Sequence, residues 1–371
     1  MISKLAAAVL LAAALQVQSD WRPARPDYSW SFPQDHWARP GYKTEWWYFT
    51  GHLTPRGERV PRYGYQFTFF RVGLAPWPPE ISSTWAAANL VMGHAALTDL
   101  ATGRHLFSEV IYRATPLLGG FGTYPDSVLV WSRGPVGTGA LWTLRWNGRG
   151  FDFTMADSAR GFAIDLRTEP VKPLVFQGPN GYSRKGAGPT AASHYYSFTR
   201  LRTAGTVALG GTSTRVTGES WMDKEFGSNQ LAASQVGWDW FSLQLDDGRE
   251  LMLYALRDST GAVDFASGTV VPRAGTPRYL SREDFVVRVT RRWRSAATDA
   301  EYPAGWVIEV PREQLRLEVE PLAADQENRS RQLTKLYYWE GAVRVRGADG
   351  RPAGRGFVEL TGYGRGARPA L

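Results

Sequence analysis

An internal repeat is the feature that most constrains the fold of this chain. The segment WWYFTGHL at 46–53 aligns residue by residue with WDWFSLQL at 238–245, and the tryptophan, phenylalanine and leucine positions coincide. The strand-like segments that follow both end in arginine, at Arg71 and at Arg257. Two copies of one pattern in the same order indicate a duplicated unit rather than one large sheet.

The two copies also end alike. Adjacent tyrosines, Tyr195-Tyr196 in the first copy and Tyr337-Tyr338 in the second, precede the comparable final strands TRVTGESWMD and GRGFVELTGYG. We therefore place the boundary between the units near residues 225–230. The predicted division is a signal peptide at 1–19, an arm rich in proline and aromatic residues at 20–41, a first domain at 42–227 and a second domain at 228–371.

The secondary structure is predicted to be almost wholly β. Short aromatic and β-branched segments, bounded by Gly, Pro or Asn, recur at the spacing of about 8–12 residues that is typical of antiparallel sandwiches and barrels. In the first unit they lie at 45–53, 63–71, 89–99, 105–113, 127–131, 140–146, 151–156 and 162–167, and a Gly-rich segment at 177–194 predicts a long loop. We predict an all-β fold of two tandem antiparallel β-barrels, because closing each sheet removes its exposed edges and leaves room for a small ligand. A sandwich is the alternative.

Composition excludes several classes of function. The 371-residue chain has no cysteine, which excludes disulfides, cysteine–zinc sites and a thiol nucleophile. Lys and Arg exceed Asp and Glu by 43 − 35 = 8, but these charges are scattered along the chain. Nucleic-acid-binding proteins concentrate their charge on one face, so we expect no nucleic-acid partner. The excess of positive charge is consistent with a solvated surface or, at most, with a peripheral contact between the protein and an anionic membrane.

The first 19 residues have the pattern of a signal peptide. Lys4 precedes an apolar run at 5–15 that is too short to span a bilayer, and Val17 and Ser19 stand at the small-residue positions before a cleavage point. No later run reaches membrane-spanning length. We expect export to the periplasm or out of the cell, with an uncleaved anchor as the alternative.

A hairpin at 238–257 follows from the turn DDG at 246–248, whose glycine occupies the left-handed position. This register makes Asp239 and Arg257 the only charges at the far end of an apolar face, diagonal to each other. A charge in that setting must be paired or neutral. Asp239 is therefore either a structural ion-pair partner of Arg257 or a carboxylic acid with a raised pKa.

The opposite face of this hairpin mixes aromatic and polar side chains. It carries Trp238, Trp240 and Tyr254 together with Ser, Gln and Met residues. Flat apolar walls with a few polar groups are typical of a ligand pocket. A half-buried strand surface has the same composition, so both interpretations stay open.

Three acids lie close together just before the second unit. Glu219, Asp223 and Glu225 fall within seven residues, beside Trp221 and Phe226. Where carboxylates lie together beside aromatic residues, one can be held protonated as a general acid while its neighbour stays ionised. The alternative is a solvated turn that leads into the next domain.

Metal and nucleotide chemistry have no support in the sequence. The five histidines show no HxH or HExxH spacing, and a lone histidine such as His94 is more often a hydrogen-bonded core residue. The GxSxG, GxGxxG and P-loop patterns are absent. We therefore expect neither a metal nor a cofactor.

Several motifs taken together resemble one known family. They are FPQDHWARPGYKTEWWYFTGHL, QFTFFR, HAALTD, GYSRKG, YYSFTRL, GESWMDKEFG and GWDWFSLQLDDGRELMLYALR, and they run from about Phe32 towards the C-terminus. As an ordered set they resemble the AttH/carotenoid 1,2-hydratase-like family of exported proteins. The resemblance implies two lipocalin-like β-barrels in tandem, in agreement with the duplication.

The resemblance also implies an activity. Carotenoid hydratases add water across an isolated terminal double bond, which requires a strong acid in a dry pocket and aromatic faces that shelter a carbocation. Asp223 falls on the aspartate of the family's W-M-D-type motif. Lys224 and Phe226 stand where the hydratases have histidine and tryptophan, and Leu256 stands near a position where a further acid is expected. AttH-type relatives accompany ABC permeases, which implies an envelope partner.

Two main hypotheses of function follow. In the first, the protein is a hydratase or hydrolase-like enzyme for an apolar isoprenoid or lipid, with candidate catalytic residues Asp223, Glu225, Glu219 and Asp239. The candidate substrate-binding residues are Glu45, Trp46, Tyr48, His94, Tyr195, Tyr196, Trp221, Trp238, Trp240 and Tyr254. In the second, the same barrels carry a lipid to an ABC-type permease without chemistry. A structural envelope protein is the third alternative.

Overall fold

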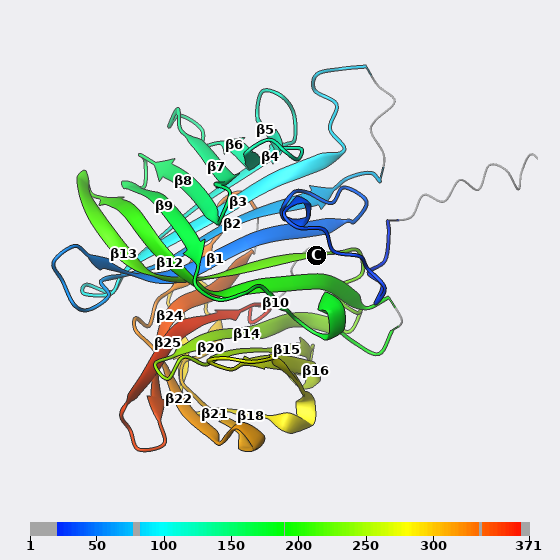
Figure 1. Cartoon of the computed structure of the whole chain (residues 1–371). Coiled ribbons are helices and arrows are strands. Elements are labelled where there is room, and N and C mark those ends of the chain that lie inside the picture. Colours follow the sequence, from blue (N-terminus) through cyan, green and yellow to red (C-terminus); the bar gives the residue numbers. More distant parts are fainter. Residues whose placement is uncertain (1–20, 77–81, 189, 334–335, 365–371) are drawn as a thin grey trace, which may run out of the picture.

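The structure is a computed structural model that describes residues 21–76, 82–188, 190–333 and 336–364. The predicted signal peptide at 1–19 lies outside these described residues. Two large antiparallel sheets curl into barrel-like folds that lie one against the other (Figure 1). This arrangement confirms the predicted all-β fold of two tandem barrels.

The first sheet has 13 strands and holds the chain from β1 to β13. They are β1 (Thr44–Pro55), β2 (Tyr63–Gly73), β3 (Asn89–Asp99), β4 (Arg104–Arg113), β5 (Gly119–Phe121), β6 (Val128–Arg133), β7 (Leu141–Trp146), β8 (Phe151–Asp157), β9 (Phe162–Pro170), β10 (Val175–Phe176), β11 (Tyr182–Arg184), β12 (Ala192–Leu209) and β13 (Thr212–Gly227). All eight segments that the sequence indicated are strands. The segment at 177–194, predicted to be a long loop, contains some regular structure, because β11 pairs with the start of β12.

The second sheet has ten strands. They are β14 (Gln235–Leu245), β15 (Glu250–Asp258), β16 (Val263–Val271), β17 (Arg278–Ser281), β18 (Val286–Val289), β21 (Trp306–Val310), β22 (Leu315–Pro321), β23 (Glu327–Arg329), β24 (Tyr337–Gly347) and β25 (Pro352–Leu360). A separate small sheet pairs β19 (Arg292–Arg294) with β20 (Glu301–Pro303), and the 3-10 turns are η1 (Gln34–His36), η2 (Pro179–Gly181), η3 (Arg282–Asp284) and η4 (Pro311–Glu313). No helix in the described part of the chain is long and apolar enough to cross a membrane.

The two large sheets share one topology. In each, the first strand lies between the second strand and the last one, so β1 pairs with β2 and β13, and β14 pairs with β15 and β25. The strands β1 and β14 are the two copies of the sequence repeat, and β13 and β25 are the predicted final strands. This shared topology is the one that the duplication predicts, and the first sheet ends at Gly227 shortly before the second begins at Gln235.

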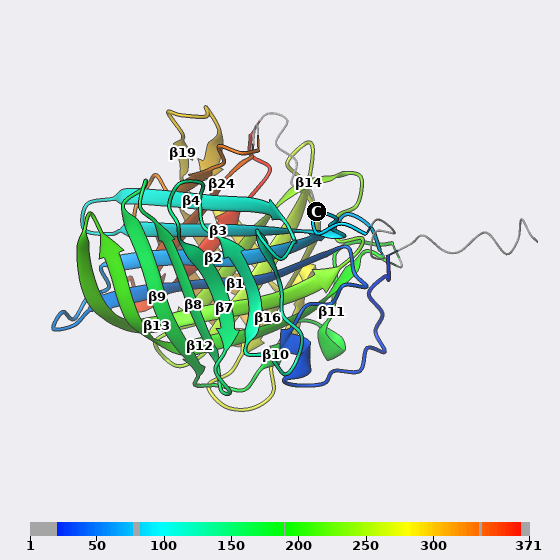
Figure 2. The ribbon, with the colours of Figure 1, turned by 90° about the horizontal axis from the view of Figure 1, so that it is seen from above.

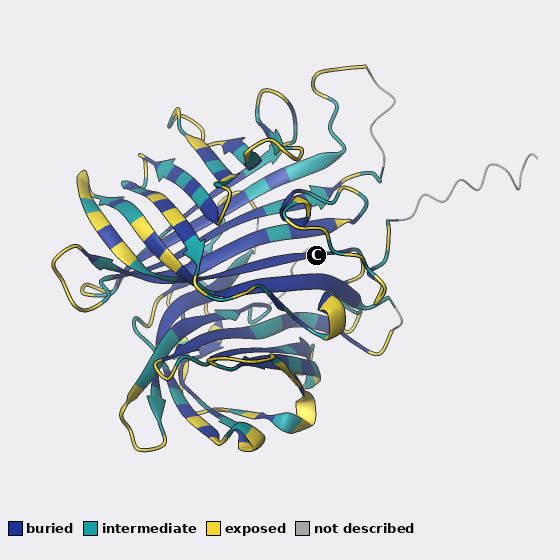
Figure 3. Ribbon diagram, in the orientation of Figure 1, coloured by how far each residue is buried: buried dark blue, intermediate teal, exposed yellow. Residues whose placement is uncertain are grey.

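Alternation along the repeated strands separates barrel interior from barrel exterior. Trp47 and Phe49 point into the core of the first barrel, and Phe241 and Leu243 point into that of the second. The residues between them point outward, where a third apolar cluster joins the barrels; it contains Tyr48, Tyr195, Trp221, Trp240, Met252, Tyr254, Leu256, Ala342 and Phe357. Side chains on successive strand positions face opposite sides, so one strand serves both a core and the junction. Buried residues accordingly follow the strands between the barrels (Figure 3).

The proline-rich arm lies against the first barrel, where it covers one end (Figures 1 and 2). Trp30 packs on Phe176 and Tyr196, and Trp37 is buried with its indole nitrogen donating to the Asp126 carbonyl at 3.1 Å. These contacts are those expected of an extended segment whose aromatic side chains close an apolar opening.

Candidate functional site

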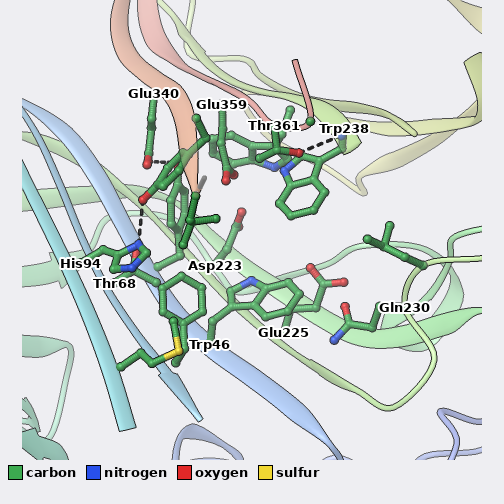
Figure 4. A pocket seen from close by; sticks show the side chains of 18 of the residues that line it. Trp46, Thr68, His94, Asp223, Glu225, Gln230, Trp238, Glu340, Glu359 and Thr361 are labelled. Atoms are coloured by element: carbon green, nitrogen blue, oxygen red, sulfur yellow. Dashed lines mark hydrogen bonds between the residues drawn. The ribbon is translucent and has the colours of Figure 1, made fainter. Parts of the chain in front are cut away.

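A cavity of about 520 Å³ lies at the junction of the two barrels. Its walls come from the outer faces of β1, β2, β3 and β13 on one side and of β14, β15, β24 and β25 on the other. The lining residues, of which Figure 4 shows a part, include Trp46, Tyr48, Phe70, Leu90, Met92, His94, Ile111, Lys185, Tyr195, Asp223, Glu225, Trp238, Trp240, Tyr254, Leu256, Tyr338, Glu340 and Glu359. Most of this wall is aliphatic or aromatic, with four acids set into it.

Strand pairing fixes the position of Asp223. On β13 it lies opposite Tyr48 of β1 and Ser197 of β12. Its neighbours at i ± 2, Trp221 and Glu225, share its face, which is the face turned towards the second barrel. The predicted strand at 214–223 is therefore real, and it places this acid beside the indole rings of the junction.

Three donors hold the Asp223 carboxyl group. Tyr195 donates its hydroxyl to Oδ2 at 2.6 Å, while Ser197 and the Trp221 indole donate to Oδ1 at 2.5 and 2.7 Å. Burial nevertheless raises the pKa of Asp223 to about 7. The three donors favour the charged form and so lower the pKa, but the effect of burial is larger, and the negative charge of Glu225 adds to the rise. A carboxyl group with such a pKa is partly protonated at neutral pH.

Glu225, unlike Asp223, has a positively charged partner. The Lys185 ammonium lies 2.8 Å from Oε1, and the Ser193 hydroxyl donates to the same oxygen. The ammonium also stands 4.3 Å from the centre of the Tyr254 ring, a cation–π contact. Burial acts to lower the pKa of Lys185, but Glu225 and Tyr254 raise it beyond its ordinary value, so Lys185 stays protonated. The two acids of β13 thus differ in their surroundings, because an ammonium group lies against Glu225 whereas three neutral donors contact Asp223.

The second barrel contributes two further acids, which were not among the residues predicted for the site. Glu340 on β24 and Glu359 on β25 are direct cross-strand partners, and both line the cavity. Glu359 lies opposite Trp240 of β14, as Asp223 lies opposite Tyr48 of β1, so the repeat places one acid per barrel at equivalent positions. A single charge within an apolar strand, as in FVEL and YWEGAV, is the signal that could have found them.

His94 reaches the cavity from β3. Its Nδ1 and the Tyr338 hydroxyl are 2.8 Å apart, which links the two barrels, and its Nε2 is buried without a hydrogen-bond partner among the described residues. Burial lowers the pKa of His94 to about 4, against an opposing effect of Glu109. The ring is therefore neutral at pH 7, and its free nitrogen is available to a polar group of a ligand.

This chain is similar in sequence and in structure to known proteins. The sequence profile of the AttH-like family matches residues 23–363. A solved structure of a candidate AttH protein from Nitrosomonas europaea is 33% identical, with a TM-score of 0.80 over 92% of this chain and 99% of that one. The chain belongs to the AttH-like family. Among curated proteins, none matches this AttH-like chain.

More distant solved structures share the fold of this AttH-like protein. Kievitone hydratase from Nectria haematococca is 13% identical, with a TM-score of 0.64 over 92% of this chain and 95% of the hydratase. CghA, in a structure with Sch210972, is 11% identical, with a TM-score of 0.50 over 88% of this chain and 89% of CghA. At these identities the comparison establishes a common fold, and activity has to be argued from the site itself.

Several residues predicted for the site of this AttH-like protein lie elsewhere. Glu45 is buried on the interior side of β1 with Arg71 and Lys224, and Tyr196 faces the arm, where its hydroxyl lies 2.7 Å from Nδ1 of His36. Adjacent residues of a strand point to opposite faces, so Glu45 cannot share the cavity with Trp46, nor Tyr196 with Tyr195.

Two candidate acids and one aromatic residue also lie outside the cavity lining. Glu219 is partly exposed and forms an ion pair with Arg200 at 3.1 Å, away from the cavity lining. Trp221 lies behind Asp223, as its hydrogen-bond donor rather than as part of the lining. Asp239 faces the second barrel and contacts Arg257 at 2.9 Å, with the hairpin register as predicted. Burial raises the pKa of Asp239 despite Arg257, but its place assigns it a structural role.

In this AttH-like protein the described residues contain no group of three or more His, Cys, Asp or Glu side chains that could hold a metal ion.

The raised pKa of Asp223 predicts a pH-dependent stability difference. Because the folded-state pKa, about 7, exceeds the ordinary value of 3.8, the stabilising effect of a neutral Asp223 is complete at low pH and is lost as the pH rises through about 7. Relative to an Asp223→Asn variant, the wild type should lose about 1.4 kcal/mol per pH unit between about pH 4 and 7 and no more above that. Urea unfolding at several pH values measures this difference, and a constant difference would contradict the assignment.

Proposed function

We propose that this protein is a hydratase-like enzyme that binds an apolar isoprenoid or lipid-type molecule in the junction cavity and adds water across one of its carbon–carbon double bonds. The observation that carries the proposal is Asp223, a buried carboxyl group with a pKa raised to about 7 by burial, in the wall of an aromatic and aliphatic cavity. Protonation of an alkene needs a protonated acid that is shielded from water, and the burial and raised pKa of Asp223 support this role.

The proton path begins at Oδ2 of Asp223. This oxygen has one hydrogen-bond partner, the Tyr195 hydroxyl, whereas Oδ1 has two, so Oδ2 is the better place for the acid proton. The Trp240 indole nitrogen lies 3.1 Å from the Tyr195 oxygen and donates to it. Asp223 transfers its proton to one alkene carbon, directly or through the Tyr195 hydroxyl, and the alkene electron pair forms the new carbon–hydrogen bond.

The positive charge that remains on the other alkene carbon must be stabilised until water adds. The indole faces of Trp46, Trp238 and Trp240 line the cavity and can stabilise this charge by cation–π attraction. A water oxygen then forms the carbon–oxygen bond, and the proton that this water releases passes to a basic group of the wall. Glu225, which forms an ion pair with Lys185, is the carboxylate on the same strand as Asp223 that can accept it.

A non-catalytic carrier is the second candidate, and the aliphatic side of the cavity favours it. Leu90, Met92, Ile111, Leu333 and Leu336 line that side, and they provide a surface for a hydrocarbon chain without any chemistry. Such a carrier would bind its lipid in the envelope and transfer it to an ABC-type permease.

One experiment separates the two candidates. The purified protein is incubated with isoprenoid and lipid extracts in water enriched in oxygen-18, and the extract is then analysed by mass spectrometry against a sample without protein. The enzyme should produce a species that has gained one molecule of labelled water. If the protein instead retains a lipid of unchanged mass and no labelled product forms, the hydratase proposal fails and the carrier remains.

A further inference from the structure

The second barrel places two carboxyl groups side by side in the cavity wall. Glu340 and Glu359 are cross-strand partners on β24 and β25, and side chains at such positions have Cβ atoms about 4.5–5.5 Å apart. Figure 4 shows both side chains at the cavity together with Asp223. The three acids therefore share one region of the wall.

The partners of this acid pair are all neutral. The Tyr48 hydroxyl and the Asn328 amide donate to Glu340, the latter at 3.3 Å, and Trp238 donates to Glu359. Within the described parts of the chain, neither glutamate forms an ion pair with a lysine, arginine or histidine. Glu225 is different, since Lys185 neutralises it.

The electrostatic surroundings of Glu340 and Glu359 favour the binding of a cation. Burial raises the pKa of Glu340 well above its ordinary value, and repulsion from Glu359 raises it further. Burial also raises the pKa of Glu359 to about 7, and Asp223 and Glu225 add to that rise. Such acids ionise readily only when a cation lies against them.

Aromatic rings surround the same acids. Trp238, Trp240, Tyr48 and Tyr338 line the cavity beside Glu340 and Glu359. Aromatic faces next to carboxylates are the usual environment for substituted ammonium groups, because ring quadrupoles and negative charge both attract a weakly hydrated cation. Neutral apolar ligands would gain nothing from the acids.

We propose that the junction cavity takes an apolar molecule that carries a positively charged, alkyl-substituted nitrogen, with the nitrogen held against Glu340 and Glu359 and the hydrocarbon part against Leu90, Met92 and Ile111. This inference rests on the proposed function, because it uses the same cavity, and it adds the chemical class of the ligand. Asp223 keeps its role as the acid, and the ammonium group positions the double bond next to it.

Three probes of equal chain length test the proposal in the full-length protein. Decyltrimethylammonium, decanol and decyl sulfate are titrated below their aggregation limits, and binding is followed by tryptophan fluorescence and calorimetry. The ammonium probe should bind at least about tenfold more tightly than decanol near pH 8, and the sulfate more weakly than either. Decanol that binds as tightly as the ammonium probe would overturn the proposal.

Variants test whether the preference for ammonium depends on Glu340 and Glu359, independently of the proposed hydration reaction. Glu340→Gln and Glu359→Gln should each reduce the preference for ammonium, whereas Glu318→Gln, on the exposed side of β22, should leave it unchanged. Asp223→Asn should strongly slow labelled-water incorporation and retain the ammonium preference, so the two proposals can fail separately. If the variants prove unstable, the wild type suffices: ammonium affinity should fall as the pH is lowered from about 8 to 5, and that of decanol should not. An ammonium affinity independent of pH would contradict the site.

Discussion

An Asp223→Asn variant is expected to lower the rate of the proposed hydration by about 10²–10⁴-fold, the range that a positioned general acid contributes. Asparagine has nearly the same shape and can still accept the hydrogen bonds from Trp221 and Ser197, so the fold and ligand binding should survive. It cannot release a proton to an alkene. The measurement is the initial rate of labelled-water incorporation, with binding of the unreacted ligand followed in parallel.

A matched control is available on the surface of the first barrel. Asp152 lies 3.4 Å from Arg167 on the outer surface and is partly exposed, away from the cavity, so Asp152→Asn should leave both turnover and binding unchanged. Turnover retained by the Asp223→Asn variant would remove Asp223 from the role of acid, while loss of both turnover and binding would indicate a structural role instead.

A Glu45→Gln variant is expected to lose about 3–5 kcal/mol of stability, the cost of leaving buried charges without their partner. Glu45 has no exposed surface, contacts Arg71 at 2.8 Å and Lys224, and accepts the backbone N–H of Arg39. Removal of its charge leaves the Arg71 guanidinium buried without its carboxylate partner, and Lys224 as well wherever that amine is protonated. Urea unfolding at neutral pH measures the loss.

The pH dependence of that loss gives an independent check. Burial lowers the pKa of Lys224 to about 7, and Glu45 acts against this effect. Without Glu45 the folded-state pKa should fall further, whereas the unfolded chain still binds the proton. The deficit of the variant should therefore grow as the pH falls below about 7. As a control, Glu320→Gln breaks the exposed pair with Arg344 and should cost no more than about 1 kcal/mol.

The fold could be predicted from sequence because its signals are local. The alternation at 46–53 and 238–245 identifies the first strand of each barrel, and the turn at 246–248 fixes the register that makes Asp239 and Arg257 partners. Both signals depend on neighbouring residues only, which is why the structure reproduces them. The duplication then determines the topology of the second barrel from that of the first.

The candidate site could be predicted only in part. Strand alternation alone predicts that only one of Tyr195 and Tyr196 lines the cavity, because adjacent residues of a strand face opposite sides. Glu340 and Glu359 could be noticed singly, as acids in the apolar runs YWEGAV and FVEL, but not as a pair. They meet only through the pairing of β24 with β25, which no local pattern encodes.

The position of the cavity has a consequence for how the two halves of the chain depend on each other. Large apolar side chains occupy the cores of both barrels, and the cavity lies outside them, where each barrel supplies half of the wall. Either half expressed alone would present its share of this wall to solvent. Covalent fusion of the copies fixes their stoichiometry at one to one, so assembly of the pocket requires no encounter between separate subunits and does not depend on protein concentration.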